Sequence, residues 1–310
     1  MKLKDLLAFL ALSLAWGSSF FWIKIAIQEI GPFLLVAFRV LFGILGLLVV
    51  LLLNRQSVSL NRRTWGVLLL LGLTNTAMPF VLISWAEQHI DSAVAAILNS
   101  SMPLFTMVIA HFALLDDKMT VQRVLGLLVG FLGVVVLSLR DLGGDVRLNL
   151  LAQGAMILAV LCYAGSTVFA RRNTKGIPPV VQALIPLLSA DALIWAAAFA
   201  FEAPVVLPSA AVTWGALVWL GLIGSCIAYM LYYYLLHSVG PTRISMVTYM
   251  FPVVGILLGG FVLPVFGVPA DKLDISLLIG AVLIIGSLLI VNYRPRTAKQ
   301  PQAAGASAAE

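Results

Sequence analysis

Charged residues are scarce in this chain of 310 residues, where Asp, Glu, Lys and Arg together make up 10%. Soluble globular domains carry about 25% charged residues, and a water-soluble fold with so few would have to expose large apolar patches. The composition therefore excludes an ordinary soluble enzyme. Hydrophobic residues make up 62% of the chain, enough for about nine or ten spanning helices of roughly 20 residues each. We interpret the sequence as a polytopic membrane protein.

Cysteine is equally rare, and Cys162 and Cys226 both lie inside apolar runs. A disulfide framework would need several cysteines in water-facing loops, and a zinc site would show CxxC or mixed His/Cys spacing. The sequence has neither pattern, so it predicts two buried thiols and no metal or cofactor. The basic residues are scattered over short loops and form no basic helix face, which excludes a nucleic-acid partner.

Catalytic motifs are missing as well. The sequence contains no HExxH, GxSxG or P-loop, and its three histidines, His89, His111 and His237, each fall near an end of an apolar run. An enzyme would need a nucleophile with its base, a metal cluster or a phosphate loop, so we predict that the chain is not an enzyme. A channel would favour rings of charge or carbonyl filters built from identical subunits. An intramembrane enzyme and a channel are kept only as remote alternatives.

Ten apolar segments are bounded by charge, proline or glycine, and short connections make neighbouring segments antiparallel. They are Leu6–Ile27, Pro32–Leu53, Trp65–Ala86, Ser92–Ala113, Val121–Leu139, Leu148–Ala170, Pro178–Phe201, Ala211–Leu236, Pro241–Leu263 and Ile275–Val291.

Positive charge is distributed unequally between the two sides of these segments. Fourteen of the nineteen Lys and Arg residues fall on the side of the two termini, and four fall on the opposite side. Under the positive-inside rule, both termini then lie in the cytoplasm. We therefore predict a multi-pass protein of the inner (plasma) membrane with the lipid bilayer around it.

The two halves of the sequence share features in register. Residues Ala15–Lys24 align with Cys162–Arg171 at an offset of 147, and Leu98–Pro103 aligns with Val247–Pro252 at an offset of 149. A unit of five helices is odd, so the second copy must cross the membrane in the opposite sense. Inverted repeats with polar, proline-interrupted helices are typical of alternating-access carriers.

The predicted fold is thus an all-α membrane protein with ten transmembrane helices, arranged as two inverted five-helix repeats around a central cavity. The first repeat comprises residues 1–140 and the second comprises residues 148–293. Residues 294–310 are rich in Ala, Pro and Gln and predict a disordered cytoplasmic tail. A monomer and a homodimer are both compatible with the pattern.

The chain also resembles a known family. The features that carry the likeness are Trp16–Phe20, Gly31-Pro32 followed by Arg39, Pro103, Gly126, Gly133, Tyr229, Gly240–Thr242, Pro252 and Gly280. In their order and spacing these resemble the ten-helix EamA-type transporters of the drug/metabolite transporter superfamily. The resemblance implies a cavity lined by spans one, three, four, six, eight and nine, with spans five and ten at the periphery. It also implies export of metabolites, amino acids or drug-like compounds, or uptake of small nutrients.

Polar and aromatic residues inside the spans are the candidates for solute binding, since a polar group in hydrocarbon is costly unless it is paired or faces a wet cavity. The alternatives are back-bonding of hydroxyls to their own helix and interfacial belts of Trp and Tyr. The candidate cavity residues are Trp16, Asn75, Thr76, Trp85, Asn99, Ser100, Tyr163, Ser166, Thr167, Ser225, Tyr229, Tyr233, Thr248 and Tyr249. Pro79, Pro103 and Pro252 are candidate hinges, because each removes a backbone hydrogen bond.

Two full charges, Arg39 and Asp191, fall within spans at similar depths from the predicted outer ends. We expect them to form a buried salt bridge between spans two and seven. Lys24 and Glu87, at outer ends, are expected to pair at the rim. The smaller multidrug members of the superfamily exchange protons at a glutamate in the first helix, and this chain has no acid between Leu6 and Gln28.

We therefore predict a secondary transporter for small organic solutes, an exporter of amino acids or related neutral metabolites. The alternative is a proton-coupled drug or metabolite antiporter that uses Asp191.

Overall fold

The computed structural model of the chain describes residues 3–54, 60–113, 121–138 and 146–292, and within these residues it contains helices and loops without β-strands. The predicted tail at 294–310 lies outside the described residues. The helices of the first half are α1 (Leu3–Gly17), α2 (Ser19–Ala26), α3 (Pro32–Leu53), α4 (Arg62–Gly72), η1 (Leu73–Ala77), α5 (Met78–Ala86), α6 (Ser92–Asn99), α7 (Met102–Ala113) and α8 (Val121–Ser138).

The second half continues in the same manner after the connection between α8 and α9. Its helices are α9 (Val146–Asn173), α10 (Pro179–Phe201), α11 (Ala211–Val218), η2 (Trp219–Ile227), α12 (Ala228–Val239), α13 (Pro241–Ser245), η3 (Met246–Met250), α14 (Phe251–Leu257), η4 (Leu258–Val262), η5 (Leu263–Phe266) and α15 (Ile275–Asn292). Hereafter the first half means residues 3–138 and the second half means residues 146–292.

Eight helical segments of the described chain are long and apolar enough to cross a membrane. They are Leu3–Ala26, Pro32–Leu53, Arg62–Ala86, Ser92–Ala113, Arg147–Asn173, Pro179–Phe201, Ala211–Val239 and Met246–Phe266. The remaining two predicted spans correspond to α8 and α15, whose apolar stretches are shorter. The fold is therefore an all-helical membrane protein.

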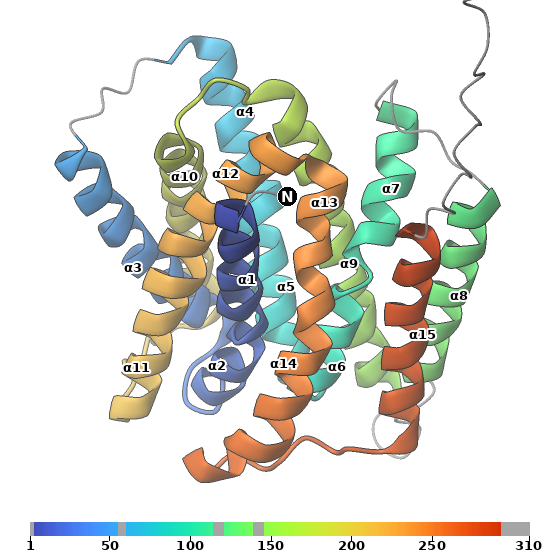
Figure 1. Cartoon of the computed structure of the whole chain (residues 1–310). Helices are drawn as coiled ribbons and strands as arrows, with labels where there is room; N and C mark the ends of the chain where they lie inside the picture. Colours follow the sequence, from blue (N-terminus) through green and yellow to red (C-terminus); the bar gives the residue numbers. More distant parts are fainter. Residues whose placement is uncertain (1–2, 55–59, 114–120, 139–145, 293–310) are drawn as a thin grey trace, which may run out of the picture.

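The long segments run side by side, and α8 and α15 pack on one another at one edge of the bundle (Figure 1). Their approach is close at Gly133, where an added Cβ would lie 3.0 Å from the carbonyl oxygen of Gly280. Small residues allow such backbone contact between apolar helices. Gly133 of the fifth predicted span thus serves packing within the chain.

Several of the long segments are interrupted near their middle. The third and eighth predicted spans each contain a π-helical stretch, η1 and η2, and the ninth contains the 3₁₀ stretch η3. The fourth is broken between Asn99 and Met102. Such irregular turns change the backbone hydrogen-bond pattern and expose carbonyl groups that a regular helix would use. These interruptions position the site described below.

Three acidic residues lie at helix N-termini of the opposite half of the chain. Both carboxylate oxygens of Glu202 accept a hydrogen bond at the start of α3, from Phe33 N and Leu34 N, each at 2.8 Å. Unpaired N–H groups and the helix dipole stabilise a carboxylate at such a place. A Cβ at Gly31 would lie 2.3 Å from Glu202 Oε1, so this cap requires glycine before Pro32.

Two more carboxylates cap helices in the same way. Glu29 accepts from Ser209 Oγ at 2.6 Å and from Thr213 Oγ1 at 2.6 Å at the start of α11. Asp271 accepts from Ser92 Oγ at 2.5 Å and from Ala93 N at 2.8 Å at the start of α6. Each of the three acids and the helix it caps belong to different halves of the chain.

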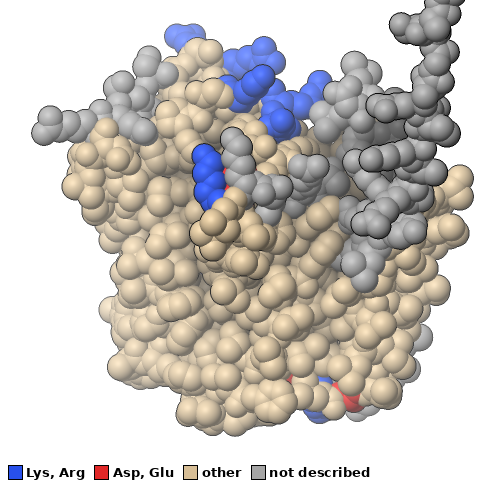
Figure 2. Space-filling model, viewed as in Figure 1, with Lys and Arg blue, Asp and Glu red and all other residues tan. Residues whose placement is uncertain are grey.

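Positive charge gathers at the opposite end of the bundle. Figure 2 shows Lys and Arg concentrated at the end where α4 begins, and the first turn of that helix contains Arg62 and Arg63. The sides of the molecule show almost no charge in this view. Large apolar side chains such as Phe112 and Leu53 are exposed, as expected for a lipid-facing surface.

The cap at Glu29 predicts a defined pH dependence of stability. Its hydrogen bonds from Ser209 and Thr213 lower the pKa of the Glu29 carboxyl from 4.5 to about 2. A group whose pKa is lowered by folding stabilises the protein above the unfolded value, and this contribution is lost as the pH falls towards the folded value. The melting-temperature difference between the wild type and Glu29→Gln in detergent should be constant above about pH 5. It should shrink towards zero near pH 2, and a difference that does not change with pH would contradict the cap.

Candidate functional site

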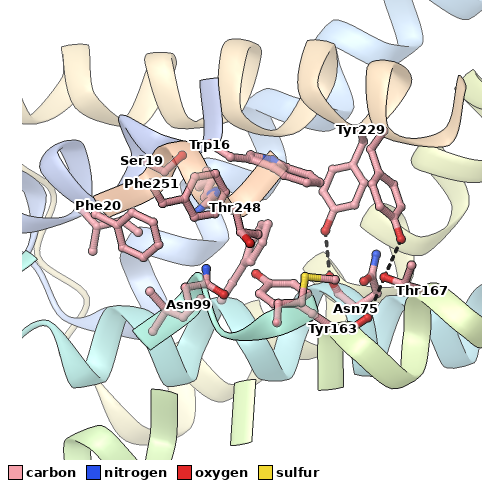
Figure 3. Close-up of a pocket in the computed structure, with 16 residues that line it drawn as sticks. Trp16, Ser19, Phe20, Asn75, Asn99, Tyr163, Thr167, Tyr229, Thr248 and Phe251 are labelled. Atoms are coloured by element: carbon pink, nitrogen blue, oxygen red, sulfur yellow. Dashed lines mark hydrogen bonds between the residues drawn. The ribbon is translucent and has the colours of Figure 1, made fainter. Parts of the chain in front are cut away.

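A cavity of about 60 Å³ lies between the interrupted helices, room for roughly four water molecules at about 15 Å³ each. Figure 3 shows its side chains converging from both halves of the chain. It is lined by Trp16, Ser19, Phe20, Ile23, Arg39, Asn75, Phe80, Ile83, Asn99, Met102, Tyr163, Thr167, Tyr229, Tyr232, Thr248 and Phe251.

Aromatic rings form much of the wall. Trp16 of α1 packs against Tyr232 and Tyr229 of α12, with ring centroids 5.4 and 5.9 Å apart. Phe20 of α2 lies 5.7 Å from Phe251 of α14. Tilted and edge-on contacts at these distances are favourable aromatic pairs. The wall therefore offers flat apolar faces with a few polar tips.

Hydrogen bonds between the halves fix the positions of these rings. Trp16 Nε1 donates to the carbonyl oxygen of Gly224 in η2 at 3.0 Å. Tyr229 OH donates to the carbonyl oxygen of Asn75 in η1 at 2.7 Å, and the second bond is drawn in Figure 3. Each bond takes a side chain from one half to a carbonyl in the π-helical stretch of the other. The irregular backbone and the cavity wall therefore depend on one another.

Half of the predicted cavity residues line this cavity. They are Trp16, Asn75, Asn99, Tyr163, Thr167, Tyr229 and Thr248. Thr167 Oγ1 and Tyr232 OH share a hydrogen bond of 2.9 Å, and Thr248 Oγ1 donates to the carbonyl oxygen of Ser245 at 3.0 Å. The side-chain oxygen of Asn99 is buried and makes no hydrogen bond to a described residue.

The other seven predicted residues do not line the cavity, and their side chains make contacts elsewhere in the bundle. Ser100 Oγ donates to Ile97 O at 2.6 Å, and Ser166 Oγ donates to Thr74 Oγ1 at 2.8 Å. Trp85 lies against the ring of His89. The hydroxyl of Thr76 pairs with the Tyr229 hydroxyl, and Ser225 Oγ donates to the carbonyl oxygen of Leu220. The hydroxyl of Tyr233 is buried, and Tyr249 packs against the hydrophobic core.

Sequence reasoning missed mainly apolar members of the wall. Phe80 and Ile83 follow Asn75 and Thr76 along α5, and their helical spacing from these polar residues could have indicated them. Tyr232 could also have been found, since it lies three residues after Tyr229 and so shares its face. The other missed residues are Ser19, Phe20, Ile23, Met102 and Phe251, and Arg39, which was predicted only as a buried charge.

The three candidate hinge prolines all lie where a helix restarts. Pro79 is the second residue of α5 after η1, Pro103 is the second residue of α7, and Pro252 is the second residue of α14 after η3. Proline fits the first turn of a helix because its missing N–H would have no intrahelical partner there. The interruptions are thus encoded by sequence, and their role as hinges stays a prediction.

The predicted salt bridge between Arg39 and Asp191 is wrong. Arg39 Nε donates to Ser225 Oγ at 3.3 Å, and the guanidinium lies 3.7 Å from the centre of the Phe80 ring. One carboxyl oxygen of Asp191 is buried without a hydrogen-bond partner among the described residues. Similar depth in the bundle does not bring two side chains together when they point in different directions around their helices.

Lys24 and Glu87 are neighbours, but their side chains do not pair as expected. Lys24 Nζ donates to the backbone carbonyls of Glu87 at 2.7 Å and Ile90 at 2.9 Å. A cation at the C-terminal carbonyls of a helix is stabilised by the helix dipole. The Glu87 carboxyl is fully buried, and neither oxygen has a hydrogen-bond partner among the described residues.

The bond from Tyr229 to η1 predicts a loss of stability when it is removed. Tyr229→Phe leaves the buried carbonyl of Asn75 without its donor, which should lower the free energy of unfolding by about 1–3 kcal/mol. The matched control is Tyr163→Phe, because Tyr163 lines the same cavity and its hydroxyl makes no hydrogen bond to a described residue. Denaturation in mixed detergent micelles measures both. Equal losses would show that the Tyr229 hydroxyl has no special role.

Comparison with known proteins places this geometry in a family. The chain is 24% identical to the uncharacterized transporter YoaV of Bacillus subtilis, covering 94% of this chain and 97% of that protein. It is 29% identical to the uncharacterized inner membrane transporter YedA of Escherichia coli, covering 84% of each. A solved crystal structure shares the fold, with a TM-score of 0.68 and 23% identity over 94% of this chain and 98% of its own. The model of the EamA-like transporter family matches twice, at residues 3–139 and 150–293, and the chain therefore belongs to the EamA-like transporter family as a multi-pass membrane transporter.

Proposed function

We propose that the chain is an alternating-access carrier of ten spans, built from two inverted five-helix repeats, that exports amino acids or related neutral metabolites. The observation that carries this proposal is the cavity between the interrupted helices, whose wall takes residues from both halves. Carriers of this type bind their solute near the middle of the membrane at the interface of the repeats.

Equivalent contacts in the two halves support the repeat. Lys24 at the end of α2 donates to the carbonyl of Glu87 after α5, and Arg171 near the end of α9 donates to the carbonyl of Leu236 in α12 at 3.1 Å. Arg171 is 147 positions after Lys24, and Leu236 is 149 positions after Glu87, which are the offsets of the sequence alignment. The same kind of bond thus recurs at matching points of both units.

The interruptions recur in the same way. The π-helical stretches η1 and η2 fall in the third and eighth predicted spans, and Pro103 and Pro252 follow the breaks in the fourth and ninth. The family model also matches once in each half. Two oppositely oriented copies of one unit can exchange conformations by symmetry, and this exchange would expose the cavity to each side in turn.

The orientation with both termini in the cytoplasm is supported by the charge distribution. Lys and Arg gather at one end of the bundle (Figure 2), and positive charge marks the cytoplasmic side. YedA is called an inner membrane transporter, which supports the same membrane for this chain. Outward transport follows from what members of this family usually do.

Counterflow in liposomes tests the function. Vesicles that contain the purified protein and a high concentration of one unlabelled L-amino acid should accumulate the same labelled amino acid transiently and saturably, and each of the twenty is tested in turn. Flux that does not saturate would indicate a channel, and chemical conversion would indicate an enzyme. If none of the twenty exchanges, amino-acid export is wrong.

Two matched variants make this result specific to the cavity. Thr248→Trp places a large ring in the cavity wall and should abolish counterflow. Val253 belongs to the next helix, α14, and is 45% exposed on the surface. Val253→Trp therefore adds its ring outside the cavity and should leave counterflow intact. Loss of exchange in both variants, or in neither, would contradict the assignment of the cavity as the path.

Proton-coupled antiport through Asp191 is the second candidate. It is favoured by the buried carboxyl oxygen of Asp191, which has no partner among the described residues. In the same vesicles, Asp191→Asn would keep counterflow but lose uptake driven by a pH gradient. Wild-type protein that shows no response to the gradient excludes this candidate.

Cysteine labelling tests the orientation. Gln28 and Lys175 are both exposed, at opposite ends of the bundle. In a background with Cys162 and Cys226 replaced by alanine, a membrane-impermeant maleimide added to intact cells should label Gln28→Cys. Lys175→Cys should react only after the cells are permeabilised, and the reverse pattern would invert the proposed topology.

A further inference from the structure

Arg39 is a cation in the wall of the cavity without an acidic partner. Its side chain is 4% exposed, and its hydrogen bond within the described chain is the one from Nε to Ser225 Oγ. Its guanidinium lies over the Phe80 ring. Neither terminal nitrogen donates to a described residue. Arginine stays charged in proteins, so this charge is present whatever the state of its neighbours.

The acids of the surrounding segments do not neutralise it. Glu202, Glu29 and Asp271 are occupied at the N-termini of α3, α11 and α6. Glu87 acts on Arg39 only as a charge at longer range, and the buried oxygens of Glu87 and Asp191 accept no hydrogen bond from it. A buried charge without a hydrogen-bonded counter-charge costs several kcal/mol. A mobile anion that enters the cavity would remove this cost.

Contacts within the chain already orient the Arg39 guanidinium for an anionic ligand. The Ser225 bond and the Phe80 ring hold the Nε side and one face of the group, and its two terminal nitrogens remain available as a fork of donors. A planar fork of this kind matches the two oxygens of a carboxylate. Little ordering of the side chain is then needed when the ligand binds.

A second group in the same cavity has the opposite requirement. Asn99 is 5% exposed, and its side-chain oxygen is a buried acceptor without a donor among the described residues. It lies at the break between α6 and α7, and Figure 3 shows it among the side chains that converge on the cavity. An ammonium or amine group of a solute would supply the missing donor.

We propose that Arg39 binds the carboxylate of an amino-acid-like solute while Asn99 accepts a hydrogen bond from its amino group. The aromatic faces of Trp16, Tyr229 and Phe251 then cover its apolar side chain. This inference rests on the proposed carrier function and narrows its cargo, since a metabolite without a carboxylate leaves the Arg39 charge uncompensated.

Matched compounds test the carboxylate requirement. Melting of the purified full chain in detergent is followed with each of the twenty L-amino acids, and every stabilising amino acid is compared with its amide and with the amine that lacks the carboxyl group. For leucine these are L-leucinamide and 3-methylbutylamine. The amino acids should stabilise the protein, and the amides and amines should not. Equal stabilisation by the amide, or no stabilisation by any of the twenty, overturns the proposal.

Variants of Arg39 separate ligand binding from a structural role. Loss of one partner of a buried charged pair should weaken amino-acid binding at least about 30-fold in Arg39→Lys and Arg39→Met. Without ligand, Arg39→Met should be as stable as the wild type or more stable, because it removes an uncompensated charge. The matched control is Arg171→Met, which removes bonds to Leu236 O and His237 O and should melt at a lower temperature. Destabilisation of ligand-free Arg39→Met would assign Arg39 a structural role instead.

An inorganic anion is the remaining source of a counter-charge. Sodium chloride is compared with sucrose at equal osmolality, and stabilisation by chloride that abolishes amino-acid binding would show that the site takes an inorganic anion. The outcomes also separate this inference from the carrier function. Arg39-dependent binding without counterflow refutes the carrier and keeps the site, whereas saturable counterflow of amino acids that is unchanged in Arg39→Met refutes only the site.

Discussion

Hydrocarbon provides no hydrogen bonds, so each backbone group of a spanning segment needs a partner inside the protein. Regular helices meet this need themselves. The segments around the cavity are interrupted, and side chains from the opposite half reach their carbonyls: Trp16 bonds to Gly224, and Tyr229 bonds to Asn75. The bonds that satisfy the backbone therefore also join the halves and fix the aromatic wall. A cavity with polar tips is a direct consequence of satisfying interrupted helices in lipid.

The same constraint decides where charges lie. Three carboxylates lie at helix N-termini, as Glu202 does at α3, and the cations Lys24 and Arg171 lie at C-terminal carbonyls. In each case the partner of the charge is backbone, at a place where the helix leaves its own groups unpaired. Arg39 departs from this rule because it lies in the interior of α3, where regular helix leaves no carbonyl available. Its partners are a hydroxyl and a ring, neither of which carries a negative charge.

Segment boundaries could be predicted from the sequence because they depend on local signals. Pro32 begins a helix and Ala86 ends one in the structure, as both do in the hydropathy pattern. The wall of the cavity was predicted only in part, because it depends on the direction of each side chain around its helix. A polar residue such as Ser166 can satisfy itself on a neighbour, while Phe20 lines the cavity without any signal in composition. The predicted pairing of Arg39 with Asp191 was wrong for this reason. Sequence position gives the depth of each residue along its span but not the direction in which its side chain points. The caps by Glu29 and Glu202 could not be predicted because each joins residues about 170 to 180 positions apart.

The caps also make the two ends of the bundle unequal. At the end where α3, α11 and α6 begin, three carboxylates bond across the halves. Hydrogen bonds to an ionised group are roughly twice as strong as neutral ones. The bonds that Trp16 and Tyr229 make between the halves across the cavity are neutral, with a net contribution of about 1 kcal/mol each. In the proposed carrier, separating the halves at the capped end breaks stronger bonds than widening the middle. Opening of that end therefore requires the larger contribution from a bound solute, and a solute that neutralises a buried guanidinium can provide it.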